Sequence, residues 1–297
     1  MNAPRFIRQA VRAVCLLLIT SAFTGCIEWE HQVVRYRYDK QTDTLLIFQD
    51  YQGIYGADQP AQLSDTEIEQ LDSVLRNQRT FFFANWIFEI SLNTLEQLQA
   101  DTRDNSGDSV AEDEERMDML ALLKVVIPNC SIQNGDFYLD DKRRISGVQR
   151  VQIRNISKIL PRLNDAIRAA FKSEARTKPA DVEAQMNYNQ VADGKWTFVE
   201  LQGNQIRVRF PHTAHFEEQD LKDVDLTEFA KSGIKISLKN RVTTATIGKQ
   251  DDRITTIAYD PFNKPYRDNL LKHLKGKVRI QDSLNVEAVA EQFLAAR

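Results

Sequence analysis

Two histidines that stand close together are the first candidates for chemistry. His212 and His215 lie three residues apart in "PHTAHFEE", with Glu217 and Glu218 directly behind them. On one turn of a helix this spacing directs two imidazoles toward one metal ion, and a carboxylate can supply a third ligand. The pair follows Pro211 and an alternating stretch typical of a strand, where helical geometry is not expected. A metal-assisted hydrolase using His212 and His215 is one hypothesis, and a pair of solvated loop histidines is the other.

A second candidate is a basic segment in the middle of the chain. Residues 142–172 hold nine lysines and arginines against one acid, Asp165. Six of them form the candidate anion-binding set: Arg143, Arg144, Arg150, Arg154, Lys158 and Arg162. Such a surface suits an anionic lipid, a glycan or an acidic envelope protein. An ordinary solvated face is the alternative, since a run of charge is weak evidence of a partner.

Motifs that indicate a particular enzyme class are missing from the sequence. It has no G-x-S-x-G, G-x-x-x-x-G-K, G-x-G-x-x-G, H-E-x-x-H or C-x-x-C pattern. We therefore expect binding rather than catalysis, although a triad can still assemble from distant residues. No cofactor is expected. Nucleic acid is not an expected partner either, because no aromatic side chains interleave the basic ones as a stacking platform.

The N-terminus carries the pattern of an export signal. Arg5, Arg8 and Arg12 precede an apolar run of about ten residues that ends at Phe23, and no acidic residue interrupts it. This length suits the hydrophobic region of a signal peptide, whereas a membrane-spanning helix needs about 20 apolar residues. Residues 1–25 are therefore predicted to be a signal peptide.

The end of the apolar run, Phe23-Thr24-Gly25-Cys26, resembles the lipobox of bacterial lipoproteins. The resemblance covers only the first 26 residues, and Phe23 stands where leucine is usual in that motif. It implies that the Cys26 thiol receives a diacylglyceryl group and that the signal peptide is removed before this cysteine. Further acylation of the new amine would complete a stable anchor, because two or more chains hold a protein at a bilayer.

The same resemblance indicates where the protein resides. A lipidated Cys26 would fix the exported chain to the periplasmic side of the envelope or to the cell surface. Ile27 follows the cysteine, whereas an aspartate there favours inner-membrane retention in enterobacteria, so the outer membrane is favoured. Cleavage after Ala22 would instead give a soluble secreted protein. Apart from Cys26, Cys130 is the only cysteine of the predicted mature chain. We expect it to be a buried apolar side chain. If Cys26 is not lipidated, a disulfide between Cys26 and Cys130 is the alternative.

Alternating and helical patterns give the expected elements. Residues 31–56 predict two strands around a turn at 40–43, and Ser64 and Glu67 form a capping box that begins a helix. Asn134-Gly135 predicts a hairpin turn. The remaining expectations are a mobile acidic loop at 100–116, a helix from 156 to 171, a hairpin at 196–210, strands up to about 259, and helices near 265–275 and 285–296.

Composition sets the class and the size of the mature protein. The chain has 297 residues, 42% of them hydrophobic, with 39 basic and 42 acidic residues. Hairpins dominate, so we predict an α+β fold with antiparallel sheets. The expected division is residues 26–30 as lipid attachment and short tether, 31–175 as an α+β domain, and 185–297 as a second domain or a continuation of the first.

Overall fold

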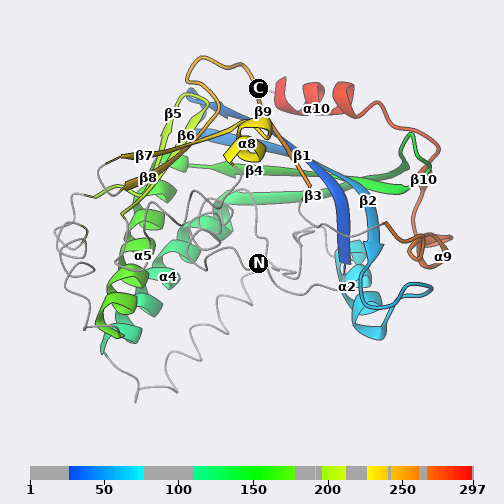
Figure 1. Ribbon diagram of the computed structural model, residues 1–297, viewed down its shortest axis with the longest axis horizontal. Coiled ribbons are helices and arrows are strands. Elements are labelled where there is room, and N and C mark those ends of the chain that lie inside the picture. The colour runs from blue at the N-terminus through cyan, green and yellow to red at the C-terminus, as the bar shows by residue number, and fades with distance from the viewer. Residues whose placement is uncertain are drawn as a thin grey trace.

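The computed structural model describes residues 27–76, 110–177, 191, 196–211, 226–239, 242–260 and 266–295. This part of the chain holds ten strands in two sheets, with six helices packed around them (Figure 1). The larger sheet has the order β10-β3-β4-β2-β1-β9 and the smaller sheet the order β5-β6-β8-β7. All strand pairs are antiparallel except β10 with β3. The predicted α+β class with antiparallel sheets is therefore confirmed.

The element bounds follow in chain order. The strands are β1 (Ile27–Asp39), β2 (Thr44–Gly56), β3 (Cys130–Leu139), β4 (Ile145–Arg154), β5 (Val199–Gln202), β6 (Gln205–Pro211), β7 (Ile234–Lys239), β8 (Val242–Ile247), β9 (Thr255–Tyr259) and β10 (Ile280–Gln281). The helices are α2 (Asp65–Arg76), α4 (Val110–Asn129), α5 (Ile156–Thr177), α8 (Leu226–Lys231), α9 (Leu271–Leu274) and α10 (Val286–Ala295).

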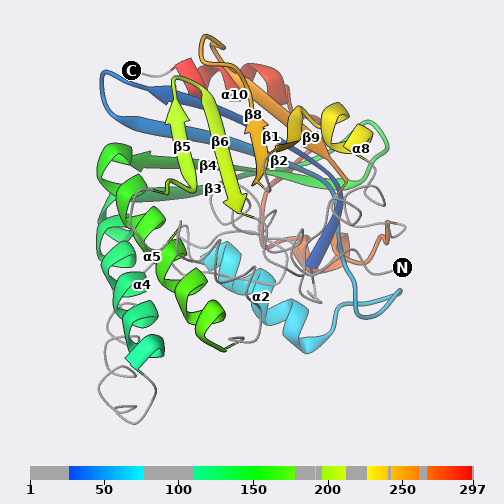
Figure 2. The same cartoon turned by 60° about the vertical axis from the view of Figure 1, so that its left-hand side comes forward.

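The larger sheet is covered on both faces. Helix α10 lies on one face, which we call the outer face, while α4, α5 and the smaller sheet pack on the inner face (Figures 1 and 2). Strand β2 in the middle of this sheet is buried along almost its whole length, with only Gln52 partly exposed. Because side chains alternate along a strand, Leu45 and Ile47 enter the inner core, whereas Leu46 and Phe48 pack beneath α10.

The inner face carries two apolar clusters with buried glutamines on the same face. The amide of Gln32 donates to Gln49 Oε1 at 2.8 Å, and the hydroxyl of Tyr51 donates to the same oxygen at 2.7 Å. Both glutamines are fully buried or nearly so. Their hydrogen bonds satisfy polar groups that would otherwise be costly in the core.

Two buried asparagines join the smaller sheet to the rest of the molecule. The Oδ1 atom of Asn164 on α5 accepts hydrogen bonds from the backbone amides of Phe198, at 2.6 Å, and Val199, at 3.0 Å. Asn204, in the β5–β6 turn, accepts from the backbone amide of Tyr38 at 2.6 Å and from the Tyr36 hydroxyl, through its carbonyl, at 2.7 Å. The two sheets are thus fixed to each other by directed bonds as well as by apolar contact.

Several local predictions are confirmed. The β1–β2 turn falls at residues 40–43, and α2 begins with the expected capping box. In it the Glu67 carboxylate accepts from the amide of Ser64 at 2.6 Å, and the Ser64 hydroxyl accepts from the amide of Glu67 at 3.3 Å. Hairpin β5–β6 and helix α5 also lie where the sequence predicted them.

Other local predictions were wrong. Asn134-Gly135 is not a turn: β3 continues through it with a register shift between Asn134 and Phe137, and the chain reverses at 140–144 instead. Strand β1 already begins at Ile27, so residues 27–30 are strand and not tether. Helix α4 begins at Val110, so 110–116 are not loop, and residues 100–109 lie outside the described part.

The C-terminal segment shares the sheet of the N-terminal one. Strand β9 pairs with β1, and β10 pairs with β3. The main core likewise combines Val34 and Ile47 with Val208 and Ile247 from the smaller sheet. Strands on both sides of the boundary expected near 175–185 therefore form one sheet and one core.

Asn164→Ala tests the connection between α5 and β5. The substitution leaves the buried amides of Phe198 and Val199 without their acceptor, and we expect it to lower the free energy of unfolding by about 2–4 kcal/mol. Arg162→Ala on the exposed side of the same helix is the control and should change stability by less than about 0.5 kcal/mol. Urea unfolding followed by circular dichroism measures both, and equal effects would show that Asn164 does not hold the two elements together.

Candidate functional site

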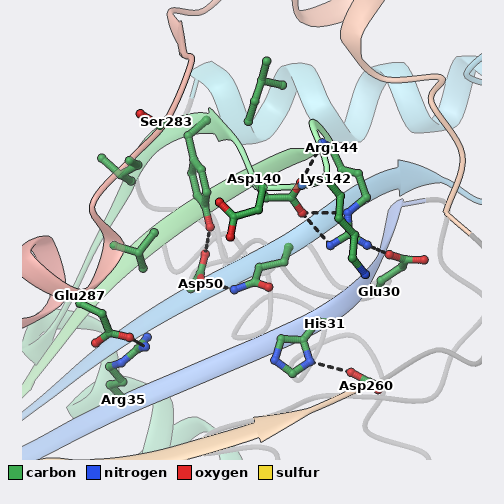
Figure 3. A pocket seen from close by; sticks show the side chains of 16 residues that line it. Glu30, His31, Arg35, Asp50, Asp140, Lys142, Arg144, Asp260, Ser283 and Glu287 are labelled. Carbon is green, nitrogen blue, oxygen red and sulfur yellow. Dashed lines mark hydrogen bonds and ion pairs between the residues drawn. The ribbon is translucent and has the colours of Figure 1, made fainter.

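A polar cleft opens on the outer face of the larger sheet, beside the start of α10 (Figure 3). Its volume of about 920 Å³ is at the upper end of the range for small-molecule sites. Strands β1 and β2 form its floor, and the β3–β4 turn and the segment before α10 form its sides. Charged side chains dominate the lining: Glu30, His31, Arg35, Asp50, Asp140, Asp141, Lys142, Arg144, Asp260 and Glu287.

Asp50 lies at the floor of this cleft. The alternation of β2 that places Leu46 and Phe48 under α10 also turns Asp50 to the outer face, where 1% of its surface is exposed. The Tyr138 hydroxyl donates to Asp50 Oδ1 at 2.5 Å, and Gln52 Nε2 donates to Oδ2 at 2.7 Å. Both carboxyl oxygens are therefore held in fixed positions.

Burial raises the pKa of Asp50 above its ordinary value. The hydrogen bonds from Gln52 and Tyr138, and the nearby charges of Arg35 and His31, offset only part of that effect. Burial also raises the pKa of Tyr138, so its hydroxyl stays protonated and remains a donor. A carboxyl group in such a setting can accept a hydrogen bond when ionised and can also donate one when neutral.

Ion pairs surround Asp50 on three sides of the cleft (Figure 3). His31 Nδ1 lies 2.6 Å from Asp260 Oδ1, and Arg35 pairs with Glu287 at the start of α10. The third group centres on Arg144, which contacts Asp140 at 2.6 Å and also pairs with Glu30. Asp260 and Glu287 are largely exposed, so solvent weakens their pairs, whereas the Arg144 group is mostly buried.

The β3–β4 turn is built to hold Arg144. Asp140 Oδ1 accepts from the backbone amides of Lys142, at 2.9 Å, and Arg144, at 2.8 Å. Its other oxygen accepts from Arg144 Nε at 2.8 Å. Arg143 takes a positive φ of 60° in this turn and points to Asp282 at 3.4 Å. Local aspartate bonds of this kind are a common way to close a turn.

Arg35 has an unused donor in the cleft. Its Nη1 atom is buried and has no acceptor among the described residues, although Nη2 pairs with Glu287. The guanidinium lines the cleft together with Asp50. A buried donor without an acceptor is costly.

A metal centre is not supported in the cleft. Among the residues that the structure describes, no three His, Cys, Asp or Glu side chains converge on a position where an ion could bind. The carboxylates of the cleft are held instead by arginine, histidine, tyrosine and amide donors. The arrangement can therefore bind a polar group through hydrogen bonds, and Asp50 can exchange a proton with it.

The basic residues predicted from the sequence do not form one surface. Arg144 lines the cleft, and Arg143 lies in the same turn but outside the lining. Arg154 ends β4 about 30 Å from this turn, as the length of a ten-residue strand requires. Arg150, between them, lies 3.6 Å from Asp136 and over the ring of Phe48. At the far end, Lys158 and Arg162 continue from Arg154 onto α5, and all three are exposed.

Other predicted site residues lie outside the described part of the chain. These are Cys26, His212 and His215. Cys130 opens β3 as a free, half-buried thiol that packs against the main core, and burial raises its pKa to about 12. This environment fits the expected role as an apolar side chain, because a thiol with such a pKa is unreactive.

Sequence reasoning did not identify Asp50 or the cleft. The only local signal is an aspartate at an alternating position of an otherwise apolar strand, in "LLIFQDY". Its partners come from β3, from β1 and from the segments around 260 and 287. A constellation assembled across such distances has no spacing pattern that a sequence can reveal.

Comparison with known proteins adds no relative. The chain matches no protein-family model, no curated protein and no solved structure. The class of the protein must therefore be judged from its own fold and from the chemistry of this cleft.

Asp50→Asn tests the electrostatic setting of the cleft. Because the folded pKa of Asp50 is raised, the stability that neutral Asp50 provides is present at low pH and is lost as pH rises through the folded pKa. The asparagine variant avoids this loss, so its free energy of unfolding relative to wild type should rise between pH 4 and pH 8. Urea unfolding across that range measures the difference.

Asp43→Asn is the matched control, because Asp43 also accepts a hydrogen bond from a tyrosine, Tyr38, at 2.8 Å. Burial tends to raise the pKa of Asp43, but hydrogen bonds from Ser157 and Tyr38 outweigh it and lower the pKa. Ionised Asp43 therefore stabilises the folded state at neutral pH, and this stabilisation is lost on acidification. The free energy of unfolding of Asp43→Asn should therefore fall relative to wild type only as pH rises toward about 4, the ordinary pKa of aspartate. Between pH 4 and pH 8 the difference should stay constant, and a rise in this range for both variants would contradict the assignment.

Proposed function

We propose that this chain is an exported lipoprotein, fixed to a membrane through Cys26, that binds a hydroxyl-rich ligand such as an envelope glycan in the cleft around Asp50. It acts as a binding or envelope-assembly module without catalysing a reaction. The observation that carries the proposal is a polar cleft that holds a fixed carboxyl group, Asp50, together with Arg35, whose buried Nη1 atom has no acceptor among the described residues.

The pairing of donor and acceptor supports a ligand with hydroxyl groups. Each hydroxyl both donates and accepts a hydrogen bond, so neighbouring hydroxyls can accept from Arg35 and donate to Asp50. The tyrosine and amide groups that position Asp50 leave the carboxyl group in place to receive such a ligand. Sugars carry this pattern of adjacent hydroxyls over a length that suits an open cleft.

The charge of the cleft argues against an anionic ligand at this site. Six of its lining residues are acids, against two arginines and one lysine, and both arginines already face carboxylates. A phosphate or carboxylate would be repelled from such a lining. A neutral, polar molecule meets neither repulsion nor the cost of burying an unpaired charge.

The location rests on the sequence pattern at the N-terminus. The three arginines, the short apolar run and the cysteine at position 26 support export and lipidation. Within the described residues no helix combines the length and the apolar character needed to cross a bilayer. The outer membrane is the proposed site of attachment, because Ile27 and not aspartate follows the cysteine.

Arg35→Lys tests the cleft. The lysine keeps the positive charge facing Glu287 but removes the second N–H donor, and we expect a loss of ligand affinity of roughly 10- to 100-fold, since a hydrogen bond to a charged group contributes about 1.5–3 kcal/mol. The wild-type protein should be retained by a subset of spots on an array of bacterial envelope oligosaccharides. Titration with the best oligosaccharide then compares the affinities.

Arg37→Lys provides the control for this change. Arg37 lies on the same face of β1 but donates to the carbonyl of Leu294 at 2.7 Å, outside the cleft. The affinity of Arg37→Lys for the oligosaccharide should stay within about twofold of wild type, because Arg37 contributes no donor to the ligand. A wild-type protein that binds no oligosaccharide, or an Arg35→Lys variant with unchanged affinity, would refute the proposed ligand class.

Cys26→Ser tests the anchor. In a bacterial host grown with an alkyne-labelled fatty acid, the wild-type protein should incorporate the label and sediment with membranes, because lipidation needs the thiol of Cys26. The serine variant should lose both properties, while Cys130→Ser should keep them. A wild-type protein that takes up no label and begins at Phe23 would favour plain secretion.

The metal-assisted hydrolase with His212 and His215 stays a second prediction of the sequence. Both residues lie outside the described part of the chain, so no geometry supports them here. The polar cleft, in contrast, has an unsatisfied donor and a fixed carboxyl group, which is the reason for preferring a binding module.

A further inference from the structure

A short basic segment follows the cleft strands near the C-terminus. Residues 269–281, "NLLKHLKGKVRIQ", contain Lys272, Lys275, Lys277 and Arg279 and no acid. All four side chains belong to exposed residues. We call these four residues the α9 basic surface, since they lie on helix α9 and the turn that follows it.

Directed hydrogen bonds fix this segment to the beginning of β1. Asn269 Oδ1 accepts from the backbone amide of Gly56 at 2.9 Å, and Asn269 Nδ2 donates to the carbonyl of Gly56 at 2.9 Å. Gly56 is the residue opposite Ile27 in the β1–β2 pair. The α9 segment is thus held beside the point where the described chain begins, as Figure 1 shows for α9 and the end of β2.

Apolar packing sets the orientation of the segment. Leu270 and Leu274 are completely buried in a cluster that contains Ile27 and Trp29. Since these leucines face inward, the lysines between and after them face outward. Leu271 is the exception: 38% of it is exposed, and it is one of two large apolar residues exposed in the described part of the chain.

The positive charge of this surface is only slightly neutralised. Lys277 contacts Asp72 at 3.1 Å, whereas Lys272, Lys275 and Arg279 have no ion pair with any described residue. The nearest acids in the sequence are Asp268 and Asp282, which flank the segment, and Asp282 already faces Arg143. Among the described residues, no acid pairs with these three cations.

We infer that the α9 basic surface contacts the anionic headgroups of the membrane to which the chain is attached. The inference rests on the proposed lipid anchor, because Cys26 is bonded directly to Ile27 and so must lie within a few ångströms of the start of β1. Lysines and arginines near an anionic bilayer are attracted to its surface. Exposed Leu271, beside Lys272, adds an apolar group that can enter the interface.

Position distinguishes this surface from the basic set that the sequence singled out. Arg154, Lys158 and Arg162 lie at the opposite end of the larger sheet, where Arg154 pairs with Thr44. A strand of 13 residues such as β1 spans about 40 Å. Electrostatic attraction in physiological salt extends only about 8 Å, so the end next to the anchor meets the bilayer and the far end does not.

Vesicle flotation of residues 26–297, the proposed mature chain without its basic and apolar signal segment, carrying Cys26→Ser measures this contact without the lipid. Two types of vesicle are used, one of phosphatidylcholine alone and one with 30% phosphatidylglycerol, at low salt. The parent protein should bind the anionic vesicles more strongly. Replacing Lys272, Lys275 and Arg279 by glutamine should lower that partition roughly 100-fold, because each basic residue near the surface contributes about fivefold.

The triple variant Arg154→Gln, Lys158→Gln and Arg162→Gln is the matched control, since it removes the same charge from exposed positions at the far end. Its partition onto the anionic vesicles should stay within about threefold of that of the parent protein. Loss of binding in this control with none in the α9 variant would overturn the inference, as would equal binding of the parent to both vesicle types. Because no acyl chain is present, either result is independent of fatty-acid labelling at Cys26, and the two proposals can fail separately.

Discussion

The burial of β2 on both faces is the constraint on which the rest of the structure depends. A strand covered by α10 on one side and by α4, α5 and the smaller sheet on the other must be apolar at nearly every position. Gln49 and Asp50 are buried polar exceptions on this strand, and Asp50 is accommodated by hydrogen bonds from Tyr138 and Gln52. Since a buried carboxyl group reduces stability unless it is satisfied, its presence at the floor of a cleft favours a role in ligand binding.

The sequence predicted the parts of the fold that depend on local patterns. Alternation located the β1–β2 hairpin, and the Ser64–Glu67 capping box located α2, because both signals act within a few residues. The turn at Asn134-Gly135 failed for a physical reason. Gly135 has no positive φ, and a Cβ atom there would come within 3.0 Å of Val148 and Arg150, so this glycine permits close approach to β4 rather than a reversal.

The candidate site could not be predicted to the same extent. Asp50 is meaningful only because Tyr138, from another hairpin, donates to it, and because the segment before α10 closes the cleft. The charge run at 142–172 was visible but misleading, since β4 carries Arg144 and Arg154 to opposite ends of the sheet. The shorter run at 272–279 has no distinctive pattern in the sequence, although it is folded against the start of β1. Charge becomes informative only when the fold shows which charges share a surface.

The net charge of the chain makes this spatial separation important. Without the three arginines of the proposed signal peptide, the chain would hold 36 basic residues against 42 acidic residues, and an anionic bilayer would repel it as a whole. Screening limits that repulsion to the charges within about 8 Å of the surface, so the end of the molecule next to the proposed anchor would determine the orientation. Cations at that end and acids in the cleft would allow the protein to rest against headgroups while the cleft excludes anions. Glu30 in the cleft is only three residues from Ile27, so a ligand held beside Asp50 would lie close to the membrane. If the proposed lipid anchor and the proposed glycan ligand are both correct, their closeness fits a module that links the membrane to the polymer beside it.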